Sequence, residues 1–520
     1  MATDPARARC PLRSSAGAAA VLTALAAGSA AAQELRIRPE VEASVTITNN
    51  AAYATSSLAE GDAIVNVNPR LALTSRGGRV SIDGVFGIEA LAYANSADAS
   101  QVRPRGRVDL RSELIDRWAY FDASVVADRV SDNPYAARPE SATAFNDYTS
   151  MRYRLTPYLQ RQLTPRLALL ARTDHVLTRR VGGTSSFDPG GTDPARDAHE
   201  QAQRIQLDLT PMPLGATLEL TREDTRHRGA ATSILNQSGV RAIATYSPAP
   251  QLTLGAIAGR EVSKYSLFKR TDPIVGGEIK WQPSERSSLE ARLEKRFFGT
   301  GVAVAWRHRT PFFGFNLAAD RRPVAQSGSH LLGFAGADVS SLLDDVLTTR
   351  FPDQSQRGEL VDQLIRDLNL PETLTSPLDL YTSYAQLQDG ASASVLFFGR
   401  LTTVSATAFA RRRVRLVNVE DVLAPATLSS DNRQFGLEMV VTRRLSPTLS
   451  ADAGLRASKI EGIGIREGEA TTDVVAQAGL SFLSGPNTRL GIGGRYQVVK
   501  STANTTSRET ALVATLLHRF

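Results

Sequence analysis

The sequence predicts an all-β protein, a single antiparallel transmembrane β-barrel of roughly 18–22 strands with one short helical insert. Apolar and polar residues alternate along most of the chain, short turns alternate with longer polar stretches, and the chain closes on an alternating run that ends at Phe520. After residue 33 no apolar run approaches the roughly 20 residues of a membrane-spanning helix. A helical membrane protein is therefore excluded.

The alternation has a period of two, which is typical of a β-strand with one apolar face and one wet face. In RSSLEARLEKRF, leucine and alanine form the apolar face, and the polar face carries four charges: Glu290, Arg292, Glu294 and Arg296. TLSADAGLRASK and RLGIGGRYQV repeat the scheme, and their polar faces include Arg456, Arg489 and Arg495. We expect these charges to face a hydrated lumen.

Strand length separates a membrane barrel from a soluble sandwich. Sandwich strands are short, whereas these runs of about 10–13 residues are long enough to cross a membrane at a tilt. A soluble all-β repeat such as a propeller is the alternative. Aromatic residues make up only 6% of the chain, which leaves few side chains for girdles at the membrane interfaces.

The connections support the barrel. Tight turns such as SRGGR, QLTPR, YSPAP and LSGPN contain the Pro and Gly residues that preset turn geometry. They alternate with longer polar stretches at 51–61, 131–147, 181–199, 418–431 and 461–471. Short turns on one side and longer loops on the other are typical of outer-membrane barrels, and an even strand count returns both termini to the periplasm.

Residues 1–32 are predicted to be a signal peptide. Three arginines precede the apolar stretch 16–27, small residues follow it, and cleavage is expected after Ala32. An N-terminal membrane anchor is the alternative, but the stretch is short for a span. Cys10, the only cysteine, lies in this segment, so the barrel chain 33–520 would contain no disulfide or thiolate site. The predicted location is the outer membrane of a Gram-negative bacterium.

Residues 340–373 interrupt the period of two. SSLLDDVLTTRF and GELVDQLIRDLNL place leucine, isoleucine and valine at helical spacing, which predicts two short amphipathic helices. Three placements are open. The helices could form an excursion in an extracellular loop, an inward-folded constriction that narrows or gates the lumen, or a periplasmic docking element.

The charges allow two interpretations. The formal charge of +7 is spread over a chain of mixed acids and bases, which argues against nucleic-acid binding. Lumen arginines could guide an anionic glycan or another acidic solute through bidentate contacts. Alternatively, they could pair with lumen acids such as Glu290, Glu294 and Asp452 and brace the wall.

Catalysis has little support in the sequence. Asp197 and His199 lie two apart near a long loop, where such a pair could activate water. Asp174 and His175 are adjacent, so they would point to opposite faces of a strand. No nucleophile-elbow motif, cofactor-binding motif or metal-ligand spacing is present. We therefore expect a protein that is not an enzyme.

Five features follow one another along the chain: IRPEVEASVTITNN, LEKRFFGTGVAVAWRHRTPFFGFNLAADR, the insert ending LNLPETL, LQDGASASVLFFGRLTTVSATAFARRR and RRLSPTLSADAGL. In these features and their order, the chain resembles a family of exported proteins associated with the PEP-CTERM/exosortase system. The family consists of large outer-membrane barrels encoded near exopolysaccharide-export genes. The resemblance implies a role in surface polysaccharide export or assembly, and no catalytic residues.

The last stretch, ALVATLLHRF, places Leu512, Leu516, His518 and Phe520 on one face, which we expect to face lipid. A terminal aromatic on the last strand resembles the signal that barrel-assembly machinery recognises, so Phe520, His518 and Leu516 are the candidate assembly signal. A buried final strand of a soluble β-protein is the alternative.

Three functions remain in view: a conduit or assembly component for exopolysaccharide export, a general diffusion porin, and a surface barrel hydrolase. A TonB-type transporter is disfavoured, because strands are predicted almost directly after the signal and leave no room for an N-terminal plug.

Overall fold

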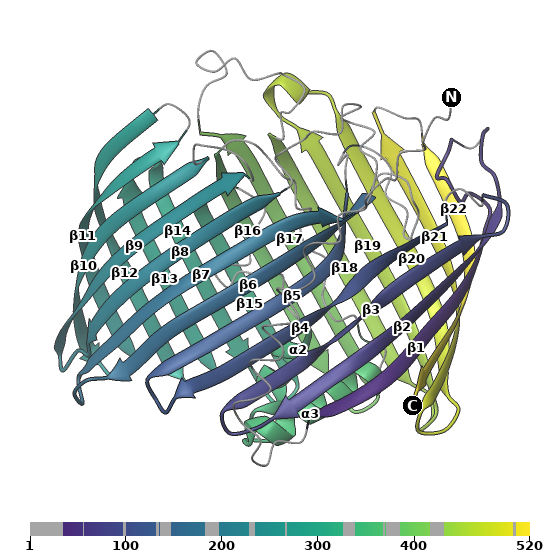
Figure 1. Cartoon of the computed structure of the whole chain (residues 1–520), viewed down its shortest axis with the longest axis horizontal. Coiled ribbons are helices and arrows are strands. Elements are labelled where there is room, and N and C mark those ends of the chain that lie inside the picture. The colour runs from purple at the N-terminus through teal and green to yellow at the C-terminus, as the bar shows by residue number, and fades with distance from the viewer. Residues whose placement is uncertain are drawn as a thin grey trace, which may run out of the picture.

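The computed structural model describes residues 35–55, 57–96, 100–131, 135, 147–181, 197–227, 234–265, 268–325, 339–367, 370, 385–416, 431–502 and 506–520. Within them, 22 strands form one antiparallel sheet that closes on itself, because β1 pairs with β22 (Figure 1). The predicted barrel is confirmed, with a strand count at the upper end of the expected range. The predicted signal peptide, residues 1–32, lies outside the described residues.

The first eleven strands are β1 (Arg36–Thr48), β2 (Asp62–Arg76), β3 (Val80–Tyr93), β4 (Gln101–Ile115), β5 (Ala119–Ser131), β6 (Asp147–Gln162), β7 (Leu167–Val181), β8 (Ala198–Leu209), β9 (Leu214–His227), β10 (Leu235–Ala249) and β11 (Leu252–Tyr265). The others are β12 (Phe268–Ser284), β13 (Ser287–Arg296), β14 (Gly299–Arg309), β15 (Phe313–Val324), β16 (Gln386–Phe398), β17 (Thr402–Arg415), β18 (Asn432–Arg444), β19 (Leu449–Gly462), β20 (Ala470–Leu483), β21 (Thr488–Ser501) and β22 (Ser507–Arg519).

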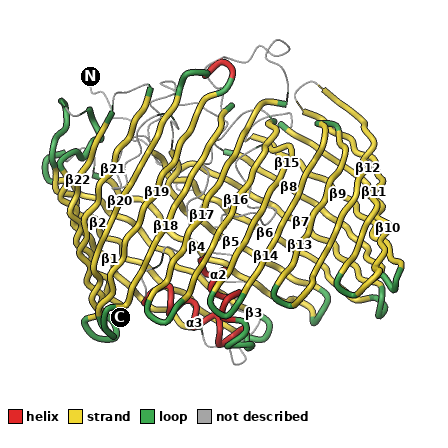
Figure 2. Tube along the Cα trace, turned by 180° about the vertical axis from the view of Figure 1, so that it is seen from behind, coloured by secondary structure: helices red, strands yellow, loops and turns green. Residues whose placement is uncertain are grey.

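The two ends of the barrel differ in their connections. At one end every turn has two to four residues, whereas connections at the other end range from two to 61 residues (Figure 2). In one short turn, Gly485 adopts a φ of +87°, which glycine reaches without steric cost. Short turns face the periplasm in outer-membrane barrels. We therefore call the short-turn end periplasmic and the other end extracellular. At the extracellular end, only two residues separate β11 from β12 and β13 from β14, which the predicted alternation of loop lengths did not anticipate.

The two faces of the wall are chemically opposite. On β22, Leu512 and Leu516 point outward and are 51% and 38% exposed. The alternate residue Glu509 points into the lumen and is fully buried. Exposed Leu, Ile, Val and Phe side chains occur on the outer face of strands around the barrel. This apolar outer surface is that of a barrel that spans a membrane, since every strand is paired and only lipid can cover it.

The three tryptophans mark one edge of the membrane-spanning band. Trp118, Trp281 and Trp306 all lie at the periplasmic end, point outward and are 42–46% exposed. Trp is enriched at membrane interfaces, where its apolar ring and its polar N–H are both accommodated. The tryptophans therefore mark the periplasmic interface of the barrel.

Two helices lie in the connection between β15 and β16, as the insert predicted: α2 (Val339–Leu347) and α3 (Gln354–Asp367). This connection begins and ends at the extracellular end, yet its helices lie at the opposite, periplasmic end (Figure 2). Among the described residues, no helix is long and apolar enough to cross a membrane.

Candidate functional site: the charged lumen

The strand register places all seven lumen charges singled out in the sequence on the inner face of the wall. Glu290, Arg292, Glu294 and Arg296 are on β13, Arg456 is on β19, and Arg489 and Arg495 are on β21. The structure does not bring them together, because β13 and β19–β21 are separate parts of the wall (Figure 1). All of them except Arg489 belong to two distinct groups with different partners.

The first group lies near β9–β13. Arg292 Nη2 is 2.7 Å from Glu278 Oε2 on β12, and Arg292 Nη1 is 3.6 Å from Glu219 Oε2 on β9. The Arg292 side chain is still 34% exposed, whereas both acids are at least 94% buried. Arg292 therefore both holds the wall and presents part of its guanidinium to the lumen.

Two further pairs join strands that are not hydrogen-bonded neighbours. Arg241 on β10 donates to Glu294 on β13, with Nε 3.0 Å from Oε1. Arg296 on β13 donates to Glu261 on β11, with Nη2 2.5 Å from Oε2. A cavity of about 390 Å³ lies beside these pairs, and the exposed Glu290 lines it with them. The bracing partners are thus largely different from the acids expected from the sequence.

The second group closes the seam between β22 and β1. Arg495 donates to both oxygens of Glu509, which also accepts from Thr48 Oγ1 at 2.9 Å and from the Tyr53 hydroxyl at 2.6 Å. Tyr53 comes from the β1–β2 connection, and its hydroxyl oxygen also lies 2.5 Å from Gln497 Oε1. Burial, together with the adjacent Glu509 carboxylate, raises the pKa of Tyr53 far above its ordinary value. The hydroxyl therefore remains a hydrogen-bond donor.

The remaining predicted lumen arginines have different settings. Arg456 lies 3.8 Å from Asp473, which also accepts from Gln497 Nε2 at 2.8 Å. Arg456 therefore extends the seam group onto β19 and β20. Arg489 lies at the periplasmic start of β21, away from this group.

A row of lumen arginines on β4 was missed in the sequence. Arg103, Arg105, Arg107 and Arg111 occupy alternate positions of QVRPRGRVDLR and share the inner face. Arg103 and Arg105 both bind the buried Glu89, at 2.6 and 2.9 Å, but Arg103 is 9% exposed and Arg105 is 59% exposed. The Arg107 side chain is 63% exposed. In the sequence, the recurrence of arginine at every second position of this stretch was the pattern that could have predicted the row.

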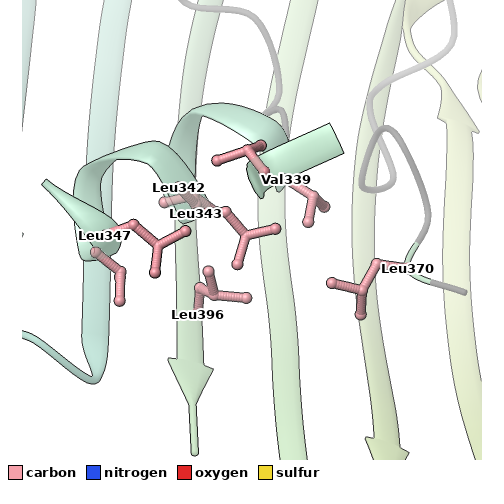
Figure 3. Close-up of a cluster of buried hydrophobic side chains, with 8 residues drawn as sticks. Val339, Leu342, Leu343, Leu347, Leu370 and Leu396 are labelled. Carbon is pink, nitrogen blue, oxygen red and sulfur yellow. The ribbon is translucent and has the colours of Figure 1, made fainter. Parts of the chain in front are cut away.

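The helices lie at the periplasmic end, where α2 packs on the inner face of the wall. Leu342, Leu343 and Val346 of α2 are fully buried against Leu396, a lumen-facing residue of β16 (Figure 3). Gly314 of β15 permits this contact, because a Cβ there would lie 3.1 Å from Val346 Cγ2. Of the three placements left open by the sequence, the structure shows the inward-folded one.

Polar contacts fix the two helices to each other and to the wall. Arg357 of α3 donates from Nε and Nη2 to the carboxylate of Asp344 on α2, at 2.6 and 3.1 Å. Arg309 of β14 donates to the carbonyl oxygen of Asp345 at 3.3 Å. A bidentate ion pair of this kind holds α2 and α3 in one relative orientation. The two helices are therefore held in a fixed arrangement at the periplasmic end of the barrel.

A second element reaches over the extracellular end. The carbonyl oxygen of Tyr135, in the β5–β6 connection, accepts from Thr471 Oγ1 at 2.6 Å and from Ser501 Oγ at 2.7 Å. Its ring packs on Ile460, and Arg466 lies over it, with Cζ 5.6 Å from the ring centroid. Since these partners belong to β19–β21 and the connection that joins β19 to β20, Tyr135 is bound to strands on the far side of the β1–β22 seam from β5 and β6.

Two of the candidate catalytic residues, His199 and Asp174, lie on opposite faces of the wall. His199 points outward and stacks on His175 of β7, with ring centroids 5.7 Å apart. Asp174 faces the lumen instead, where it binds Arg172 and Thr156. Among the described residues, no group of three or more His, Cys, Asp or Glu side chains could hold a metal ion.

No family model and no curated protein matches this chain. Among solved structures, the chain is similar to OpdK of Pseudomonas aeruginosa, solved with vanillate, with a TM-score of 0.34, 10% identity, and 93% of this chain and 99% of that chain covered. It is also similar to the siderophore receptor PirA of Acinetobacter baumannii (TM-score 0.46, 8% identity, 93% and 80% covered). The FrpB iron transporter of Neisseria meningitidis gives a TM-score of 0.46, 10% identity, and 93% and 81% covered. These likenesses supply no argument about what this chain carries.

Proposed function

We propose that this chain is a non-enzymatic outer-membrane conduit that takes part in the export or assembly of an anionic exopolysaccharide. The observation that carries the proposal is the pair of exposed lumen arginines on β4, Arg105 and Arg107. Their backbone positions lie about 6.7 Å apart along one strand. Carboxylate or sulfate groups of a linear polymer can therefore bind first to one guanidinium and then to the next. The resemblance to the exopolysaccharide-locus barrels points to the same class of solute.

A general diffusion porin is the second candidate, and its support is the hydrated, charged lumen itself. The elements at the two ends favour the restricted conduit, since α2 packs inside the lumen and Tyr135 reaches over the other end. A surface hydrolase is disfavoured because His199 stacks on the outer face, away from the lumen acids.

The test combines a deletion strain with the variant Arg105→Gln/Arg107→Gln. Deletion is expected to abolish secreted polymer, and the wild-type gene to restore it. In planar bilayers, the variant is expected to lower the anion-to-cation permeability ratio by about two-fold or more, because two exposed positive charges leave the lumen.

The control is Arg260→Gln, which removes an exposed arginine that points away from the lumen. Its permeability ratio should equal that of the wild type. Normal polymer in the deletion strain would leave the diffusion porin as the better proposal. An unchanged ratio in the double variant would remove the role of the two arginines.

We also propose that the terminal strand addresses the chain to barrel-assembly machinery. Phe520 points outward at the periplasmic end and is 70% exposed, while its backbone N–H donates to Pro39 on β1 at 3.0 Å. Its ring meets the His518 ring edge-on, with centroids 4.7 Å apart. His518 is in turn hydrogen-bonded to Thr488 on β21, at 2.9 Å.

Replacing Phe520 by Ala should lower the amount of protein in the outer membrane without changing the stability of barrels that do assemble. Membrane fractionation gives the first quantity and the temperature of the gel-mobility shift of the folded barrel gives the second. Leu512→Ala, which trims an outward side chain of β22 outside the candidate assembly signal, is the control. Normal assembly of the Phe520 variant would contradict the proposal.

A further inference from the structure

A row of charged side chains crosses four neighbouring strands on the outer face of the barrel. Arg321 of β15 is the register partner of Asp389 on β16, Asp389 of Arg412 on β17, and Arg412 of Arg433 on β18. All four point outward, because they alternate with lumen-facing residues such as Arg413. Each lies within four residues of the extracellular end of its strand.

The outer face below this row is apolar. Phe435, Leu437 and Met439 follow Arg433 down the same face of β18 and are 41%, 49% and 44% exposed. In a membrane-spanning barrel these residues meet acyl chains. The charged row above them therefore lies at the level of the lipid headgroups in the outer leaflet.

The row has more cations than anions. Asp389 is shared, with Oδ1 3.3 Å from Arg321 Nε and Oδ2 3.5 Å from Arg412 Nη1. Arg412 is 47% exposed and stands directly opposite Arg433, which is also exposed. Like charges directly opposite each other on neighbouring strands are destabilising unless an anion joins them.

The next strand, β19, does not neutralise the excess positive charge of the row. Glu461 of β19 is the register partner of Arg433, but it is in contact with Lys459 two residues away on the same strand. With these two residues included, the row holds four cationic and two anionic side chains. An anion with several oxygens would complement it.

We propose that Arg412 and Arg433, flanked by Arg321, hold a phosphate group of a phosphorylated glycolipid in the outer leaflet. Guanidinium groups present planar pairs of N–H donors that fit phosphate oxygens, and they remain charged at any physiological pH. The acyl chains of the same lipid lie on the apolar face below. The barrel is thus anchored by tryptophans at the periplasmic interface and by lipid phosphate at the extracellular one.

The experiment titrates purified full-length protein in neutral detergent with lipid A and counts bound lipid by native mass spectrometry. Arg412→Gln/Arg433→Gln is expected to weaken binding by about ten-fold or more, because the charged hydrogen bonds to phosphate are lost. The matched control is Arg443→Gln. It removes an exposed, outward-facing arginine at the periplasmic end of the same strand as Arg433, and it should bind like the wild type.

Three further results decide the proposal. Wild-type protein should bind dephosphorylated lipid A as weakly as the double variant binds lipid A, and equal binding of the two lipids would overturn the role of phosphate. Inorganic phosphate alone should not compete at millimolar concentration, and full competition would show an ion site in place of a lipid site. If the double variant unfolds at a lower temperature without lipid, the single variant Arg433→Gln replaces it, and unchanged binding there overturns the proposal.

Discussion

Replacing Leu342 and Leu343 with glutamate should raise the single-channel conductance in planar bilayers by about two-fold or more, because α2 leaves the periplasmic end of the lumen. Both side chains are fully buried against the wall. Truncating one buried leucine costs about 2–5 kcal/mol, and burying a carboxylate there costs more. The wall itself is held by strand pairing that α2 does not share. The helix is therefore expected to detach while the barrel stays folded.

Thr349→Glu is the control, since this exposed residue follows α2 and a carboxylate there remains in water. Gly314→Val provides an independent route to the same result, because its side chain would displace Val346 from the other side of the contact. Unchanged conductance in both the double leucine variant and Gly314→Val would show that α2 does not limit ion flow.

The second large effect is expected from Glu509→Ala at the seam. Glu509 is fully buried and accepts from Arg495, Thr48 and Tyr53. Removing one partner of a buried ion pair costs about 3–5 kcal/mol, since the other charge is left buried without compensation. The folded barrel should therefore lose its compact mobility on gels at a markedly lower temperature than the wild type.

Asp109→Ala tests the same chemistry without burial. Asp109 pairs with Arg107 at 2.6 Å, but the two side chains are 35% and 63% exposed, and such pairs contribute only about 0–1 kcal/mol. We expect its unfolding temperature to stay close to that of the wild type. Equal losses in the two variants would mean that burial at the seam adds nothing.

The barrel could be predicted because its governing signal is local. A period of two assigns each residue of a strand to one face, so a single stretch such as RSSLEARLEKRF already places Arg292 and Glu294 in the lumen. Fold class follows from strand length and from the presence of many such stretches. Neither inference requires knowledge of which strands lie opposite each other.

The ion-pair partners of the lumen residues could not be predicted, because they depend on which strands lie near each other in the closed barrel. Glu294 binds Arg241, which is 53 residues away in sequence, and nothing local selects this arginine. The position of α2 could not be predicted for the same reason. Its apolar face shows that it must be buried, but the surface that buries it, Leu396 beside Gly314, exists only once β15 and β16 have paired.

The ion pairs that skip strands also have a mechanical consequence. Where β10–β12 carry the wall from the front of the barrel to the back (Figure 1), Arg241 reaches over Gly259 and Gly276 to Glu294. A Cβ at either glycine would lie 2.1–2.3 Å from a neighbouring carbonyl oxygen, so both residues must be glycine where the sheet curves this tightly. The Arg241–Glu294 ion pair links β10 to β13 across the inner, concave face of the sheet, and it therefore resists flattening of the sheet there. The cross-section of the lumen is therefore set by charge as well as by strand number.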